Sequence, residues 1–188
     1  MASVLQEMIE QFGLPEKPRT EVIPRASVLD WMHSDDIEVL GALYAFLMKA
    51  DYARRVQPSL SFSDYSVFLR DYFERCFLEN PDGDWTHSRY AAAWDLASWF
   101  GATWRDPHVD RQELATIKNW LAKIYKGGDD AIKRCVVDGT LEHLFEDRDI
   151  VRFFSDWKKD PKLAIAYGEA LEWSAKGGRT GLARDETE

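Results

Sequence analysis

Four polar residues stand together at the start of a tryptophan-rich stretch: Thr86, His87, Ser88 and Arg89. If a helix begins here, its free backbone N–H groups present a partial positive charge that suits an anion. The side chains of His87 and Arg89 would strengthen such a site. In the simpler interpretation, which we favour, Ser88 or Thr86 only caps the helix, and Arg89 pairs with a nearby aspartate, Asp82 or Asp84.

Asp95 is the second polar group of interest, because it interrupts an apolar run between Trp94 and Leu96. A buried carboxylate requires a partner, such as an arginine or a tryptophan N–H. Alternatively, burial would raise its pKa and let it act as a general base. We favour structural pairing. Asp95 therefore joins the four residues above as a candidate anion or pocket site, and no catalytic residue is predicted.

The sequence is acidic, with 24 Lys and Arg against 33 Asp and Glu, a formal net charge of −9 and a pI near 5.0. This charge disfavours general binding of nucleic acid and suits a basic protein partner, although solubility alone also explains it. Six carboxylates are candidates for the surface patch that would meet such a partner: Asp35, Asp36, Glu38, Glu142, Glu146 and Asp149.

No pattern points to a metal or a cofactor. The four histidines include two Asp-x-x-His patterns, at His33 and His87, but both lie at expected helix starts, where convergence of the two side chains is not assured. The Glu-x-x-His motif of di-iron bundles is missing. Walker, Rossmann, GxSxG and HExxH motifs are missing as well. We therefore predict no bound metal and no cofactor.

The two cysteines, Cys76 and Cys135, fall in apolar helical patterns. We expect free, buried thiols in a reducing compartment, and a disulfide remains open as the alternative. The first residues lack the basic region of a signal peptide, and no apolar run reaches the length of a membrane span. The expected location is the cytoplasm, without membrane contact.

The stretch 85–104 contains four of the eight tryptophans and predicts one long helix, which begins at Thr86 or Ser88 and ends before Pro107. On this helix Tyr90, Trp94 and Trp104 share a face with small residues, while Trp99 extends the apolar surface round the other side. A helix that is apolar nearly all round belongs inside a domain. We therefore predict that its aromatic rings form the core.

Apolar periodicity and capping residues predict further helices on both sides of this one. They are expected at about 3–12, 34–54, 63–79, 110–126, 129–137 and 160–173, with shorter helical stretches at about 28–32, 141–145 and 150–157. Gly139–Thr140 is expected to interrupt one helix and Gly177–Gly178 to end the last. The fold class is all-α, a single-domain bundle of seven or eight helices over residues 1–178. Residues 1–33 form a proline-interrupted N-terminal segment, and residues 179–188 a polar, frayed tail.

Several segments resemble a family of uncharacterised bacterial helical proteins. They are Glu79–Trp85, Ser88–Tyr90, Trp94–Asp95, Trp99–Phe100, Leu121–Tyr125, Gly139–Glu146 and Phe154–Trp157. The resemblance covers roughly residues 63–173. It implies an all-α bacterial domain and carries no activity or catalytic residue with it.

Small size, acidity and the missing catalytic motifs favour a non-enzymatic protein-binding domain, of the kind that serves as an immunity protein or antitoxin. The alternative is a small enzyme or ligand-binding bundle with a closed cavity beside Trp94 and Trp99, whose polar groups would be Asp95, His87 and Arg89. Homo-oligomerisation through leftover aromatic faces is a third alternative.

Overall fold

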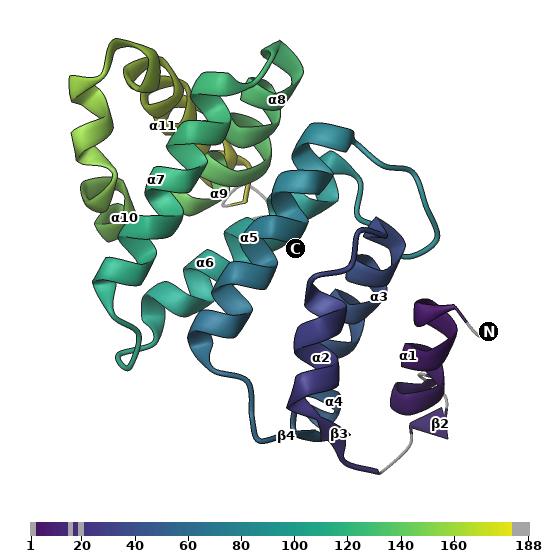
Figure 1. Ribbon diagram of the computed structural model, residues 1–188. Helices are drawn as coiled ribbons and strands as arrows, with labels where there is room; N and C mark the ends of the chain where they lie inside the picture. Colours follow the sequence, from purple (N-terminus) through teal and green to yellow (C-terminus); the bar gives the residue numbers. More distant parts are fainter. Residues whose placement is uncertain (1–2, 15–16, 19–20, 182–188) are drawn as a thin grey trace, which may run out of the picture. The chain divides into compact units, whose positions relative to one another are not determined.

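The computed structural model describes residues 3–14, 17–18 and 21–181 (Figure 1). Of the described residues 75% are helical, and they include eight helices of seven residues or more. The all-α prediction is therefore confirmed. No helix in these ranges combines the length and the apolar character that crossing a membrane requires.

Contacts between residues cluster into two compact units, Met1–Ser88 and Arg89–Glu188. Residues 1–178, predicted as one helical domain, therefore include parts of both units. The boundary between the units falls inside the polar segment of Thr86 to Arg89, after Ser88. The elements of each unit are given separately below.

The first unit contains helices joined by short segments, which include four two-residue strands in the described residues. Its elements are α1 (Val4–Phe12), β1 (Gly13–Leu14), β2 (Lys17–Pro18), β3 (Ile23–Pro24), α2 (Arg25–Met32), α3 (Ile37–Leu47), α4 (Ala50–Ala53), β4 (Val56–Gln57) and α5 (Phe62–Glu79). β1 pairs with β2 in the antiparallel sense, and β3 pairs with β4 in the parallel sense.

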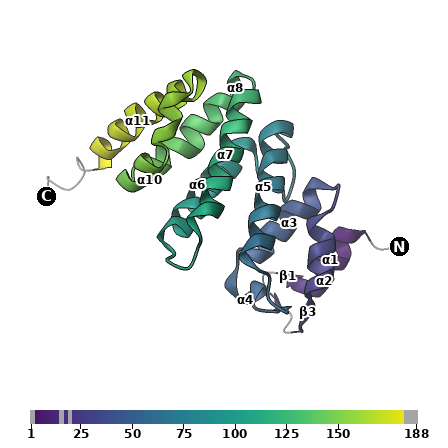
Figure 2. The ribbon, with the colours of Figure 1, turned by 60° about the vertical axis from the view of Figure 1, so that its left-hand side comes forward.

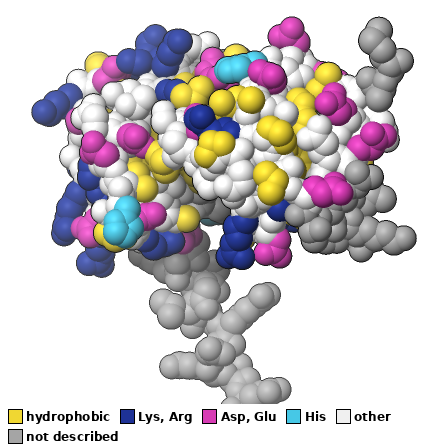
Figure 3. Space-filling model, turned by 60° about the horizontal axis from the view of Figure 1, so that its bottom comes forward, with side chains coloured by type: hydrophobic (Ala, Val, Ile, Leu, Met, Phe, Trp, Pro, Cys, Tyr) yellow, Lys and Arg dark blue, Asp and Glu magenta, His cyan; other side chains and the backbone are white. Residues whose placement is uncertain are grey.

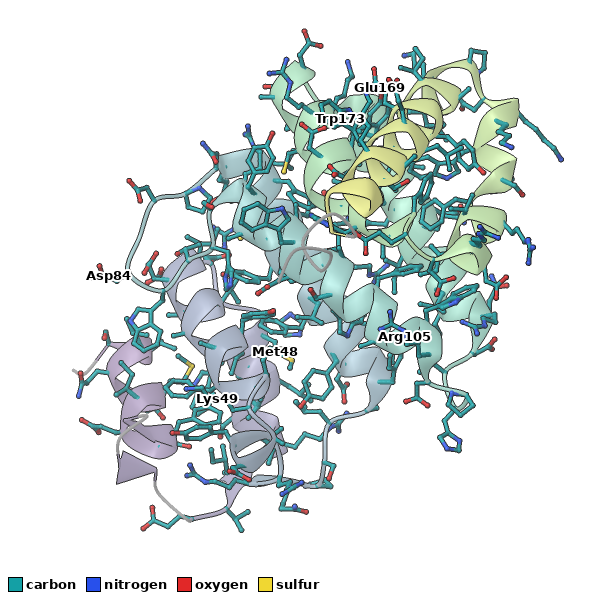
Figure 4. All side chains as sticks on the ribbon, turned by 180° about the vertical axis from the view of Figure 1, so that it is seen from behind. Met48, Lys49, Asp84, Arg105, Glu169 and Trp173 are labelled. Carbon is teal, nitrogen blue, oxygen red and sulfur yellow. The ribbon has the colours of Figure 1, made fainter. Side chains whose placement is uncertain are left out.

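Capping side chains fix where these helices begin. Ser3 accepts a hydrogen bond from the backbone of Gln6, and Asp36 accepts one from Glu38. Ser61, rather than the predicted Ser63, caps α5, because Ser61 and Asp64 form a reciprocal capping box. α3 ends before Met48 and Lys49 (Figure 4) and does not run on to Arg54 as predicted, and the short α4 follows it.

Aromatic rings fill the core of the first unit. Phe12 of α1 stacks on Phe46 of α3 with ring centroids 4.7 Å apart, and both rings contact Tyr52. Arg55 donates hydrogen bonds to the carbonyl oxygens of Gln11 and Phe12, at 2.6 and 2.7 Å. A cation at this end of α1 satisfies carbonyls that the helix itself leaves unpaired, so Arg55 stabilises the position of α1.

The second unit contains the remaining helices, which can be followed in Figure 2. Its elements are α6 (Arg89–Arg105), α7 (Arg111–Gly127), α8 (Asp130–Arg134), the π-helix η1 (Cys135–Leu141), α9 (Glu142–Leu144), α10 (Arg148–Phe153), the 3-10 helix η2 (Ser155–Lys159) and α11 (Pro161–Gly181).

The helix break predicted at Gly139–Thr140 is wrong, since a continuous π-helix runs through both residues. Gly139 lies against α6, where a Cβ atom would stand only 2.7 Å from the Cβ of Ala93. Thr140 donates a hydrogen bond to the carbonyl of Ala93 at 3.2 Å. The glycine therefore serves close packing of η1 on α6 and does not end the helix.

The prediction that the tryptophan rings of the stretch 85–104 form the core is also wrong. Small and medium side chains of α6 are buried: Ala92, Ala93, Leu96, Ala97, Phe100 and Gly101. Trp94 is 54% exposed, and Trp85, Trp99 and Trp104 are half-buried. The close approach of η1 explains the difference, because large rings would not fit between helices that meet at Ala93 and Gly139.

The last helix continues beyond Gly177–Gly178 and ends at Gly181. Two glycines weaken a helix by roughly 1 kcal/mol each relative to alanine, but they do not remove the backbone hydrogen bonds that extend it. Residues 182–188 of the expected frayed tail lie outside the described residues.

Candidate functional site

Thr86 and His87 are held inside the first unit by hydrogen bonds to α3 and α5. The carboxylate of Glu38 accepts hydrogen bonds from the hydroxyl of Thr86 and from the backbone N–H of Trp85, the latter at 2.9 Å. The hydroxyl of Tyr72 lies 2.7 Å from Nδ1 of His87 and accepts the backbone N–H of His87 at 3.0 Å. Burial raises the pKa of Tyr72, so this hydroxyl keeps its proton.

These contacts occupy polar groups of Thr86 and His87, two residues of the candidate anion site. The hydroxyl of Thr86 faces a carboxylate, which repels an anion. The ring of His87 lies edge-on to Tyr44, with centroids 4.8 Å apart, and is half-buried. The arrangement gives Thr86 and His87 a structural role in fixing the loop of residues 80–88.

The other predicted pocket residues lie at or beyond the boundary between the units. Ser88 is the last residue of the first unit, whereas Arg89 and Asp95 belong to α6 in the second. The carbonyl of Arg89 accepts a hydrogen bond from the thiol of Cys135 at 3.4 Å. Asp95 is half-buried and takes part in a hydrogen bond or electrostatic interaction.

The six carboxylates of the candidate partner patch are divided equally between the units. In the first unit, Asp35 is exposed, the exposed Asp36 caps α3, and the half-buried Glu38 holds the loop as described. In the second, Glu142 is half-buried on α9 and Glu146 is exposed. Asp149, also exposed, forms an ion pair of 2.7 Å with Arg152.

The negative charge is concentrated in the first unit. Residues 1–88 contain 8 Lys and Arg against 15 Asp and Glu, a formal charge of −7, whereas residues 89–188 contain 16 against 18, a formal charge of −2. Exposed carboxylates at the N-terminus of α3 and in the adjoining loop contribute to this excess: Asp35, Asp36, Asp82 and Asp84. We call these four residues the acidic face; Figure 4 shows Asp84 at the outer side of the loop.

A groove of about 1060 Å³ lies in the second unit, between α6 and the segment that carries α9 and α10. Its walls include the exposed Trp94 and the small residues Ala97 and Gly101 of α6. The remaining lining residues are Ser98, Arg105, His143, Leu144, Glu146, Asp147, Arg148 and Ile150. We call this the Trp94 groove. Its lining does not include His87, Arg89 or Asp95, so this groove differs from the closed cavity that the alternative function places beside those residues.

Three of the lining side chains are cations or can become cations. Arg105, His143 and Arg148 are exposed, and none forms a side-chain hydrogen bond or an ion pair with another described residue. Gly101 leaves space beside α6, and both terminal nitrogens of Arg105 lie 4.0 Å from the position of a Cβ atom on this glycine. The guanidinium of Arg105 therefore lies over Gly101, at the groove.

The sequence contained a signal for this groove that was assigned to the core. Residues 94, 97, 98, 101 and 105 follow the i, i+3, i+4, i+7, i+11 spacing of one helix face. The face combines one large ring, small residues and an arginine. An arginine is rarely fully buried, so this stripe was compatible with an exposed face of the helix as well as with the core.

Hydrophobic side chains also reach the surface elsewhere, and Figure 3 shows several of them on one face of the molecule. In the second unit the large ones are Tyr90, Trp94, Ile165 and Trp173. Trp94 and Tyr90 are neighbours on α6, with ring centroids 6.5 Å apart.

No group of three or more His, Cys, Asp or Glu residues in the described ranges is arranged to hold a metal ion.

The two thiols are free and buried, with Cys76 on α5 of the first unit and Cys135 on η1 of the second. Burial raises the pKa of each thiol to about 12. A thiol with such a pKa is protonated at neutral pH and is a poor nucleophile.

Comparison with known proteins adds no family to this description. No family model, no curated protein and no solved structure matches the chain. The function is therefore argued from the residues alone.

Proposed function

We propose that this chain is a non-enzymatic protein-binding domain, similar in role to an immunity protein or antitoxin, and that its acidic face binds a basic protein partner. The observation that carries this proposal is the excess of acidic over basic residues in residues 1–88, 15 against 8, together with the exposure of Asp35, Asp36, Asp82 and Asp84. Such an excess steers a positively charged partner toward the surface and is neutralised when the complex forms.

Internal contacts hold the acidic face in place before any partner arrives. Glu38 binds the backbone and side chain of residues 85–86, and Tyr72 binds His87. Arg75 joins α5 to the start of α3 through the carbonyl of Asp35 at 3.0 Å. A surface that is ordered in the free protein loses little conformational entropy on binding, which favours affinity.

The charges of the loop are not balanced locally. Asp82 and Asp84 are exposed, and their side chains form no ion pair or hydrogen bond with any residue in the described ranges. The N-terminus of α3 offsets part of the charge of Asp35 and Asp36, but the loop has no such compensation. Cationic side chains of a partner would supply it.

The test is affinity capture from a cell lysate at low salt, using the full chain and the double variant Asp82→Asn/Asp84→Asn. The matched control is Glu7→Gln/Glu10→Gln, which removes two negative charges from the exposed side of α1. We expect one basic protein to be recovered in stoichiometric amount by the wild type and the control, and to be lost with the loop variant. Recovery of no partner, or equal recovery by both variants, would contradict the proposal.

The alternative function, a ligand-binding helical bundle, has one observation in its favour. The Trp94 groove offers a volume of about 1060 Å³ beside an exposed indole. Such a site would use Trp94, Arg105 and Arg148 and not the residues expected from the sequence.

A further inference from the structure

We propose that the Trp94 groove binds a nucleotide, with the base against the indole of Trp94 and the phosphate between the guanidinium groups of Arg105 and Arg148. The site is independent of the acidic face, because all of its lining residues belong to the second unit. It extends the alternative function of ligand binding, and it does not require a protein partner.

The two arginines supply the site for the phosphate. Some cations of this unit are paired with carboxylates, as Arg152 is with Asp149 and Lys126 is with Asp160. Arg105 and Arg148 have no such partner among the described residues, although both line one groove. Guanidinium groups bind phosphate oxygens through paired hydrogen bonds, so two of them facing one space favour a phosphate-bearing ligand.

The indole of Trp94 supplies the site for the base. Its exposed fraction is 54%, which is unusual for so large an apolar side chain in a protein with a well-packed core. Stacking of a base on an aromatic ring is sequence-tolerant and favourable, and it would cover this surface.

The spacing along α6 suits a ligand with a ring at one end and an anion at the other. The guanidinium of Arg105 lies over Gly101, seven residues after Trp94. At the rise of an α-helix these two positions are about 10 Å apart. A sugar and a short phosphate chain bridge such a separation, whereas inorganic phosphate alone would leave the indole exposed.

Two carboxylates also line the groove, and neither prevents this assignment. Asp147 accepts the backbone N–H groups of Asp149 and Ile150 and so caps α10. Glu146 is exposed and can accept a hydrogen bond from the amino group of a base. The acidity of the whole chain disfavours a long phosphate backbone, so the expected ligand is a free nucleotide and not a nucleic acid.

The experiment is isothermal titration calorimetry of the full chain with three probes: ADP, adenosine and inorganic phosphate. We expect ADP to bind at least 10-fold more tightly than either adenosine or phosphate. Trp94→Ala should weaken the binding of ADP and adenosine about 10-fold, because it removes the stacking surface. Arg105→Gln/Arg148→Gln should weaken ADP about 10-fold and leave adenosine unchanged.

Matched controls separate the groove from general effects of charge and aromatic content. Trp173→Ala removes an indole of similar exposure from α11, and Arg152→Gln/Lys162→Gln removes two exposed cations outside the groove. The side chains replaced in the groove are exposed, so the helical circular dichroism spectrum should not change. The proposal is overturned if no probe binds at millimolar concentration, if phosphate binds as tightly as ADP, or if control and groove variants weaken ADP equally.

Discussion

Gly41 of α3 lies in direct contact with the backbone of Trp85. A Cβ atom at Gly41 would stand 2.5 Å from the carbonyl oxygen of Trp85 and 3.0 Å from the Cα of Thr86. The neighbouring atoms are backbone and cannot rotate away. The loop that carries Asp82 and Asp84 therefore packs directly on α3 at Gly41, where any larger side chain would collide with the loop backbone.

Gly41→Ala should lower the free energy of unfolding by about 1–3 kcal/mol, since the added methyl group displaces the loop. This loss exceeds the gain of about 1 kcal/mol that alanine gives in a helix. The control is Gly168→Ala on α11, where nothing lies within 4 Å of a Cβ atom and a gain in stability is expected. Urea unfolding followed by circular dichroism measures both, and equal effects at the two glycines would contradict the prediction.

Asp156→Ala should destabilise the protein by about 1–3 kcal/mol, because it removes the counter-charge of a nearly buried ammonium, although the Asp156 side chain is itself 54% exposed. The side chain of Lys118 is only 9% exposed, and its Nζ lies 2.8 Å from Asp156 and 3.0 Å from the carbonyl oxygen of Phe153. Asp149→Ala breaks an ion pair of 2.7 Å whose two side chains are both exposed, and should cost less than about 1 kcal/mol. Thermal unfolding of the two variants compares the two losses of stability. A larger loss for Asp149→Ala than for Asp156→Ala would contradict the prediction.

Asp64 makes stability depend on pH in the acid range. Its pKa is lowered chiefly by the hydrogen bond from Arg25, at 2.7 Å, and further by the backbone and side chain of Ser61. A lowered folded-state pKa gives stability that is complete above the unfolded value, near 3.8, and is lost as pH falls through the folded value. In the variant Asp64→Asn, the free energy of unfolding should therefore fall less steeply as the pH is lowered. Urea unfolding at a series of pH values below 5 measures it, and identical slopes for wild type and variant would count against the prediction.

The two thiols should resist modification in the folded protein. Burial raises the pKa of Cys76 and Cys135 to about 12, so the thiolate fraction at pH 8 is very small and the sulfur atoms are inaccessible. A disulfide-exchange reagent such as dithionitrobenzoate should react with both thiols in guanidinium chloride and with neither in buffer within the same time. Rapid reaction of either thiol in buffer would disagree with its buried position.

The positions of the helices were predictable from local signals, whereas the face of each helix that is buried was not. Capping aspartates mark the start of α3 and α7 in the sequence as they do in the structure. The π-helix at Cys135–Leu141 has no local sequence signal, and Gly139 within it packs on Ala93, a residue far away in the sequence. The same contact explains why small residues of α6 are buried and its tryptophan rings are not.

The candidate sites, too, were predictable only in part. The favoured interpretation was that Thr86 or Ser88 caps the helix, but the hydroxyl of Thr86 donates to Glu38, which was expected at the surface as part of a binding patch. A carboxylate near a helix start has the same sequence signature whether it meets solvent or holds a loop. The Trp94 groove depends on side chains from α6 and from residues 143–150, so no local pattern could assemble it.

The unequal exposure of the indoles gives the protein an internal optical reporter. Trp31, Trp120 and Trp157 are buried, at 6%, 9% and 2% exposure, whereas Trp94 and Trp173 are about half exposed. A small quencher such as acrylamide reaches the last two first, and the emission that it removes comes from the solvent-relaxed, longer-wavelength part of the spectrum. Occupation of the groove would shield one of these two emitters, so the fluorescence of the unlabelled chain can report on it.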